Sequence, residues 1–231
     1  MSNQAELRGG AAVMWYDGLF KELEASKDPE RAEKMSAYMK DKFPFLGLQK
    51  SRLDEIIKPY YKESRKADFD WGFVRLCWDK PYREAQYVAV GYVLLHQKKL
   101  EKDDLEKIHE FIVEKSWWET VDMLDTAVGT IVMKYPELKQ TMLEWSVSDN
   151  LWLRRAAIDF QLKYKEQTDR ALLSRIIQNN LGSKEFFINK AVGWSLREYA
   201  KTNGDWVRRF LTEFDDRLAP LSKREASKHL K

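Results

Sequence analysis

The sequence predicts an all-α protein in which antiparallel helix pairs stack into a solenoid. Three observations indicate this class. No stretch of the 231 residues alternates apolar and polar side chains at a period of two, as a half-buried strand would. The chain has only 10 Gly and 6 Pro, and its charged residues are spread throughout, which is typical of a helix-rich composition. In addition, an aromatic residue recurs at a constant interval of 35 residues.

This repeat is clearest between the segments that contain Trp152 and Phe187, which superpose at aromatic, basic, small and tyrosine positions. The same step backwards from Trp152 reaches Trp117 and then Tyr82. A period of this length, with two helices and short turns, is typical of solenoids of the HEAT or TPR kind. We therefore expect the four aromatic residues to lie in the core between repeats. The second helices of successive pairs should line one concave surface of a right-handed α-α superhelix.

The helices are predicted in order as follows. An apolar stripe from Met14 to Leu23 indicates the first. Asp28 and Pro29 are typical of the N-cap and first turn of a second helix that runs to about Lys40. A Ser222–Glu225 capping box predicts the start of the last helix. The other helices are expected over residues 51–63, 68–79, 82–97, 103–115, 117–133, 137–147, 150–164, 168–180, 184–201 and 205–213, and the last over 222–230.

Composition also limits the organisation of the chain. No linker separates two halves, so we expect one HEAT-like repeat domain over residues 11–231, preceded by a disordered N-terminus over residues 1–10. No apolar run approaches the roughly 20 residues of a membrane span, and no signal peptide is evident, which favours a cytoplasmic protein. The single cysteine, Cys77, excludes an internal disulfide or a cysteine-rich metal site and is expected to be buried.

Positive charge is concentrated in the second half of the chain. The formal net charge is +3, whereas residues 150–210 carry twelve Lys or Arg against six Asp or Glu, a local net charge of +6. A polyanionic partner that docks on this region would explain the excess, and so would a scatter of solvated side chains.

The heptapeptide SWWETVD at residues 116–122 is the most distinctive stretch. On a helix, Trp118 and Asp122 would be neighbours at i and i+4, with Cβ atoms about 5–6 Å apart. The pair could hold a cationic group between an indole face and a carboxylate, or it could simply be packing and capping.

Several standard catalytic arrangements are absent from the sequence. It has no glycine-rich phosphate loop and no GxSxG motif, and its three histidines are isolated from one another. Trp118, Trp194, Arg155 and Arg197 remain, a set suited to a surface that binds a sugar-phosphate chain. Arg155 could equally pair with Asp159, four residues later.

Five segments resemble the bacterial AlkD-type alkylpurine DNA glycosylases. They are YMKDKFPFLGLQ at 38–49, SWWETVD at 116–122, SDNLWLRRAAI at 148–158, KEFFINKAVGWSLREY at 184–199 and LAPLSKREA at 218–226. The resemblance implies HEAT-like repeats curved round duplex DNA, which agrees with the repeat described above. It also implies hydrolysis of the N-glycosidic bond of positively charged N3- and N7-alkylated purines, such as 3-methyladenine and 7-methylguanine, in base excision repair.

The resemblance also implies roles for individual residues. Asp122 would stabilise the oxocarbenium-like sugar, and Trp118 and Trp194 would form aromatic walls beside the lesion nucleotide. Arg155 would grip a phosphate. Residues at positions where family members contact DNA are Tyr38, Gln49, Lys163 and Arg197, and the basic side chain of Lys190 joins them as an expected DNA contact.

The implied protein needs no cofactor and no metal, does not bind a membrane, acts as a monomer and works in the cytoplasm on the nucleoid. Two alternatives stay open. One is a non-catalytic paralogue on the same scaffold that binds DNA structures, and the other is a protein-binding helical scaffold.

Overall fold

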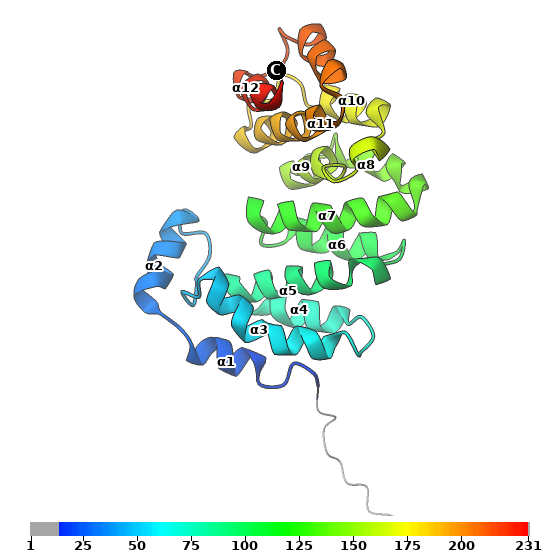
Figure 1. The fold of residues 1–231 in the computed structure, drawn as a ribbon. Helices are drawn as coiled ribbons and strands as arrows, with labels where there is room; N and C mark the ends of the chain where they lie inside the picture. The colour runs from blue at the N-terminus through cyan, green and yellow to red at the C-terminus, as the bar shows by residue number, and fades with distance from the viewer. Residues whose placement is uncertain (1–13, 231) are drawn as a thin grey trace, which may run out of the picture. The chain divides into compact units, whose positions relative to one another are not determined.

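The structure, a computed structural model, describes residues 14–230 and contains twelve α-helices and no strand within them (Figure 1). The all-α prediction is confirmed. The expectation of a disordered terminus over residues 1–10 lies outside the described residues. No helix among those described is long and apolar enough to cross a membrane. The helices are α1 (Leu19–Ala25), α2 (Pro29–Tyr38), α3 (Lys50–Ser64), α4 (Trp71–Asp79), α5 (Arg83–His96), α6 (Asp104–Val113), α7 (Trp118–Lys134), α8 (Lys139–Trp145), α9 (Leu151–Asp159), α10 (Arg170–Gln178), α11 (Phe186–Glu213) and α12 (Pro220–Ala226).

The chain divides into two compact units, one that ends at Val88 and one that begins at Ala89. In the first unit α1 packs against α3. Asp28 accepts a hydrogen bond from the Arg31 backbone N–H and caps α2, as predicted. The buried Glu84 carboxylate accepts hydrogen bonds from the backbone N–H groups of residues 46–48. This anchor fixes the loop that leads into Gln49, the residue that precedes α3.

The second unit is built from stacked helices. Helix α9 packs against α7 on one side and α11 on the other, and α12 packs against α11. Helices α6, α8 and α10 pack behind this row, α6 against α7 and α8 against α9 (Figure 1). A short connection joins α6 to α7 and another joins α8 to α9, as expected for helical repeats. The second helices of successive pairs are therefore neighbours in space.

The repeated aromatic residues hold this row together. Trp117, Trp152 and Phe187 stand at the starts of α7, α9 and α11, and their ring centroids lie 5.0–5.6 Å from one another. Trp117 and Trp152 are buried, as is Tyr82 in the first unit, whereas Phe187 is half-buried. The predicted aromatic core between repeats is confirmed for Trp117, Trp152 and Phe187, whose rings meet, and Tyr82 is buried as expected.

Gly129 allows α7 and α9 to approach closely. A Cβ atom at this position would lie 2.3 Å from the carbonyl oxygen of Phe160. The Tyr164 hydroxyl also donates a hydrogen bond of 2.5 Å to the Gly129 carbonyl oxygen. Only a residue without a side chain fits this crossing, which sets the spacing between the two helices.

Some local predictions differ from the structure, whereas one predicted break between helices is confirmed. The helix predicted over 150–164 ends at Asp159 and continues as turns. The break predicted between the segments 184–201 and 205–213 is present within α11, at a kink where Asn203 has a non-helical backbone and its side chain accepts a hydrogen bond from the N–H of Trp206. The predicted capping box is wrong, because Pro220 occupies the first turn of α12, so Ser222 and Glu225 lie inside the helix.

Candidate functional site

Asp122 and Arg155 form a two-point ion pair between α7 and α9. Arg155 donates from Nε to Asp122 Oδ1 at 2.6 Å and from Nη2 to Oδ2 at 2.8 Å. Its Nη1 donates to the carbonyl oxygen of Phe187 at 2.6 Å, which ties the guanidinium to the start of α11. Because two parallel hydrogen bonds fix the plane of a carboxylate, Asp122 is held in one orientation.

Local sequence explains why Asp122 stands at this place. Trp117 has extended backbone and α7 begins at Trp118, so Trp118 and Asp122 lie one turn apart on the same face. Trp118 is half-buried, and the Asp122 side chain keeps 15% of its surface exposed, whereas that of Arg155 keeps 4%. The carboxylate is therefore accessible from solvent, and the guanidinium that orients it is not.

Two further carboxyl groups lie behind this ion pair. Asp125 and Asp159 are buried, and oxygen atoms of Asp122, Asp125 and Asp159 all lie within 4.8 Å of one another. Arg155 Nη2 is 3.9 Å from Asp159, so the ion pair expected at i+4 is present but longer than the pair with Asp122. Among the described residues, neither oxygen of Asp159 has a hydrogen-bond partner, and Asp125 Oδ2 has none.

The side chains of Arg155, Asp122, Asp125 and Asp159 would carry a net negative charge if all of them were ionised. Three carboxyl groups face one guanidinium, and burial raises the pKa of Asp125 and of Asp159, with Asp122 as a further negative neighbour of both. Burial opposes the charge of Arg155, but the hydrogen bonds to Asp122 and the nearby carboxylates outweigh it and raise the pKa of Arg155. Arg155 already engages both oxygens of Asp122, so Asp125 and Asp159 would hold the two remaining negative charges, and a proton on each of them leaves the group neutral.

A cavity of about 350 Å³ opens beside this group, between α7 and α9. Its walls include Asp125, Asp159, Thr130 and Tyr164, and the exposed Lys163 lies at its edge. Lys163 is also one of the positive charges that act on Asp125. Of the predicted DNA contacts, Lys163 is thus placed beside the Asp122 group.

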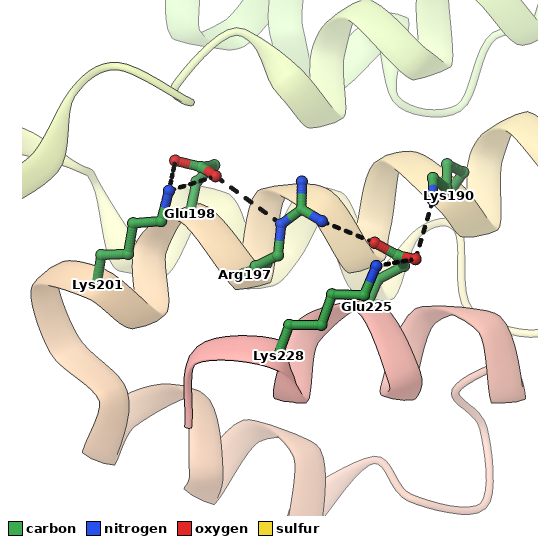
Figure 2. Close-up of polar contacts among 6 residues, drawn as sticks. All are labelled: Lys190, Arg197, Glu198, Lys201, Glu225 and Lys228. Atoms are coloured by element: carbon green, nitrogen blue, oxygen red, sulfur yellow. Dashed lines mark hydrogen bonds and ion pairs between the residues drawn. The ribbon is translucent and has the colours of Figure 1, made fainter. Parts of the chain in front are cut away.

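Three predicted residues share one face of α11. Lys190, Trp194 and Arg197 follow one another at spacings of four and three residues, which aligns them along the helix. Lys190 and Arg197 both reach Glu225 on α12, as Figure 2 shows. Trp194, which lies between Lys190 and Arg197 in the sequence, is half-buried. Tyr38 and Gln49 lie in the first unit, and both are exposed.

Sequence reasoning missed Asp125, Glu225 and the closeness of Asp122 to Arg155. By repeat arithmetic Arg155 lies about half a turn from the phase of Asp122, yet its long side chain spans the gap between the helices. A signal for Asp125 was available, since it follows Asp122 by three residues on a helix.

Comparison with known proteins decides the family. The model of the DNA alkylation repair enzyme family matches residues 19–230. The chain belongs to the DNA alkylation repair enzyme family. A solved structure, the "Predicted DNA alkylation repair enzyme from Enterococcus faecalis", is 35% identical with a TM-score of 0.82, and the match covers 88% of this chain and 96% of that one. No protein of curated function matches the chain.

Membership of the DNA alkylation repair enzyme family supports a role for this protein in the repair of alkylated DNA. It also supports the assignment of the protein as an enzyme that binds DNA. The Asp122–Arg155 pair and the cations of α11 are the features of the described residues that suit such a role.

Proposed function

We propose that the protein is a monofunctional DNA glycosylase that releases cationic N3- and N7-alkylated purines from duplex DNA by hydrolysis. The observation that carries the proposal is the Asp122 carboxylate, which Arg155 holds with two hydrogen bonds while part of its surface stays exposed. A fixed anion that solvent can reach is suited to stabilise a developing positive charge.

The chemistry requires little else. Alkylation at N3 or N7 leaves the purine positively charged, so the base departs as a neutral molecule and needs no strong general acid. As the N-glycosidic bond breaks, positive charge develops on the deoxyribose. Asp122 would stabilise this charge, directly or by positioning the attacking water. Trp118, one turn before Asp122, would offer its π face to the same cation, and Trp194 would form a second wall.

Arg155 has a positioning role in this proposal. All three of its nitrogen atoms already donate to Asp122 or to the carbonyl of Phe187, and the side chain is buried. A direct contact between Arg155 and a phosphate, which the family resemblance implies, is the alternative. The salt dependence of DNA binding distinguishes the two roles.

DNA binding would rest on cations at the surface. We propose that Lys163, Lys190 and Arg197 contact the phosphate backbone in the second unit, and that Tyr38 and Gln49 contribute from the first. Undamaged duplex should therefore bind with an affinity that falls as salt rises.

The proposal is tested by the selectivity of base release. Purified protein should release free 7-methylguanine from methylated duplex DNA, in buffer with a chelator, and should leave a neutral damaged base in a matched duplex in place. The neutral base is a poor leaving group, and the protonated acids of this site, Asp125 and Asp159, are buried behind the ion pair. Equal release of neutral and cationic bases, or release of neither, would contradict the proposal.

A further inference from the structure

The buried carboxylate of Glu225 on α12 gathers three cations. Lys190 Nζ and Lys228 Nζ lie 2.9 and 2.8 Å from Oε1, and Arg197 Nη1 lies 2.8 Å from Oε2 (Figure 2). The Glu225 side chain is 4% exposed, whereas those of Lys190 and Lys228 are 38% and 47% exposed. The cluster thus has its negative charge inside and its positive charges at the surface.

The contact between α11 and α12 is built to place this carboxylate. A Cβ atom at Gly193 of α11 would lie 2.6 Å from the Cβ of Glu225 and 2.9 Å from the carbonyl oxygen of Ser222, so only glycine allows this approach. The hydroxyl of Ser222 donates to the carbonyl oxygen of Asn189 at 2.7 Å and fixes the register of the two helices. Pro220 sets the start of α12. Glu225 is therefore presented to α11 by rigid helices.

The cations keep unused hydrogen-bond capacity. Each lysine ammonium has three donors and gives one to Glu225. Arg197 uses Nη1 for Glu225, whereas its buried Nε lies 3.9 Å from Glu198 Oε1 (Figure 2). Glu198 pairs with both Arg197 and Lys201, so the cluster holds four cations and two carboxylates, and two positive charges are in excess (Figure 2). Such a cluster is neutralised by an oxyanion with several acceptor atoms.

The pairing with Glu225 also limits how the cations move. A free lysine side chain samples many rotamers, and an interaction that fixes it in advance lowers the entropy lost when a ligand binds. Hydrogen bonds from Lys228 and Lys190 lower the pKa of Glu225 to about 2, so the carboxylate stays ionised at neutral pH.

We propose that Glu225 is a positioning residue that organises Lys190, Arg197 and Lys228 into a subsite for one backbone phosphate of DNA. The inference rests on the proposed function only in that the protein binds DNA. It adds Lys228 as a phosphate contact and assigns Glu225 a role in binding, although its charge opposes that of DNA.

The test measures binding of an undamaged duplex by fluorescence anisotropy over a range of salt concentrations, with the full-length chain. Lys228→Ala is compared with Lys223→Ala, a matched control on α12 whose ammonium pairs with Asp215 rather than Glu225. Lys228→Ala should weaken binding several-fold and lower the slope of log affinity against log salt by about 0.9, the value for one phosphate contact. Lys223→Ala should leave the slope unchanged.

The role of Glu225 is tested by repeating Lys228→Ala in a Glu225→Gln background. If Glu225 positions Lys228, then Lys228→Ala should cause no further loss of DNA affinity in the Glu225→Gln background. If Glu225 only offsets charge, Lys228→Ala should weaken binding by the same factor in both backgrounds, and the positioning role is rejected. Should Glu225→Gln not fold, Lys190→Ala and Lys228→Ala are combined in one variant. If both lysines bind the same phosphate, the double variant should lose less DNA affinity than the product of the two single losses. A loss of affinity equal to that product would overturn the shared subsite.

Failure of the phosphate subsite and failure of the proposed function give different results. If the native protein binds and excises but Lys228→Ala behaves like Lys223→Ala, the subsite is rejected and the proposed function stands. If the native protein binds no duplex at any salt concentration, the proposed function is rejected together with the subsite.

Discussion

Arg155 donates one hydrogen bond to each oxygen of Asp122, and so a residue of α9 fixes a carboxylate of α7. The pair is asymmetric, because the carboxylate reaches solvent and the guanidinium does not. This asymmetry favours Asp122 as the group that meets a ligand and Arg155 as the group that orients it.

The role of Arg155 is tested with Arg155→Met, which removes the charge and keeps much of the volume. Loss of one partner from a buried ion pair should lower the free energy of unfolding by about 3–5 kcal/mol, so measurements are made well below the melting temperature of the variant. Base release should slow at least tenfold because Asp122 loses its fixed orientation. The salt slope of DNA binding should not change. A slope lower by about one would instead make Arg155 a phosphate contact.

The buried acidic pair predicts an unusual pH dependence of stability. Asp125 and Asp159 have raised pKa values in the folded protein, so the folded state retains a proton that the unfolded chain releases above about pH 4. The free energy of unfolding then falls as pH rises from this value towards the folded pKa, by about 1.4 kcal/mol per pH unit for each retained proton.

Asp159→Asn removes this contribution, because an amide replaces the neutral acid. Denaturant unfolding between pH 4 and 7 should show a shallower fall for the variant and a higher stability at pH 7 than for the native protein. Asp205→Asn serves as a control, since Arg208 lowers the pKa of Asp205 and this residue adds no such fall. Identical pH profiles for native protein and Asp159→Asn would show that Asp159 holds no proton.

The helix crossing at Gly129 predicts a loss of stability on adding one methyl group. Gly129→Ala would place a Cβ atom 2.3 Å from the Phe160 carbonyl oxygen, and the helices must separate, at a cost of about 1–3 kcal/mol. Gly204→Ala is the matched control on α11, where the nearest atom is 3.5 Å away and the substitution should be neutral or stabilising. The melting temperatures of both variants are measured, and that of Gly129→Ala should be the lower. Equal melting temperatures would contradict the close crossing of α7 and α9.

The sequence predicted the helices well because their signals are local or periodic. The 35-residue interval located Trp117, Trp152 and Phe187, which meet in the structure, and Asp28 with Pro29 marked the start of α2. The failure at Ser222 and Glu225 has a physical cause. A capping box and an interior pair at the same spacing look alike in sequence, and here Pro220 and the contact with α11 decide between them.

The candidate site could be predicted only in part. The spacing of Trp118 and Asp122 follows from one helix, but the bond between Asp122 and Arg155 depends on how α7 and α9 pack. Glu225 lies 28 residues from Arg197 in sequence, and only the close approach at Gly193 brings them together. Apart from the aromatic residues of the repeat, contacts between helices arise from packing, for which a single sequence carries no direct signal.

The most direct test of the proposed mechanism is single-turnover release of 7-methylguanine from methylated duplex DNA by the native protein and by Asp122→Asn. Asparagine keeps the shape of the side chain and removes its charge, so excision should slow by orders of magnitude while DNA affinity stays within a few-fold of native. Thermal melting of the variant controls for folding. Release at the native rate by Asp122→Asn would contradict the account, because the carboxylate charge would then play no part in the reaction.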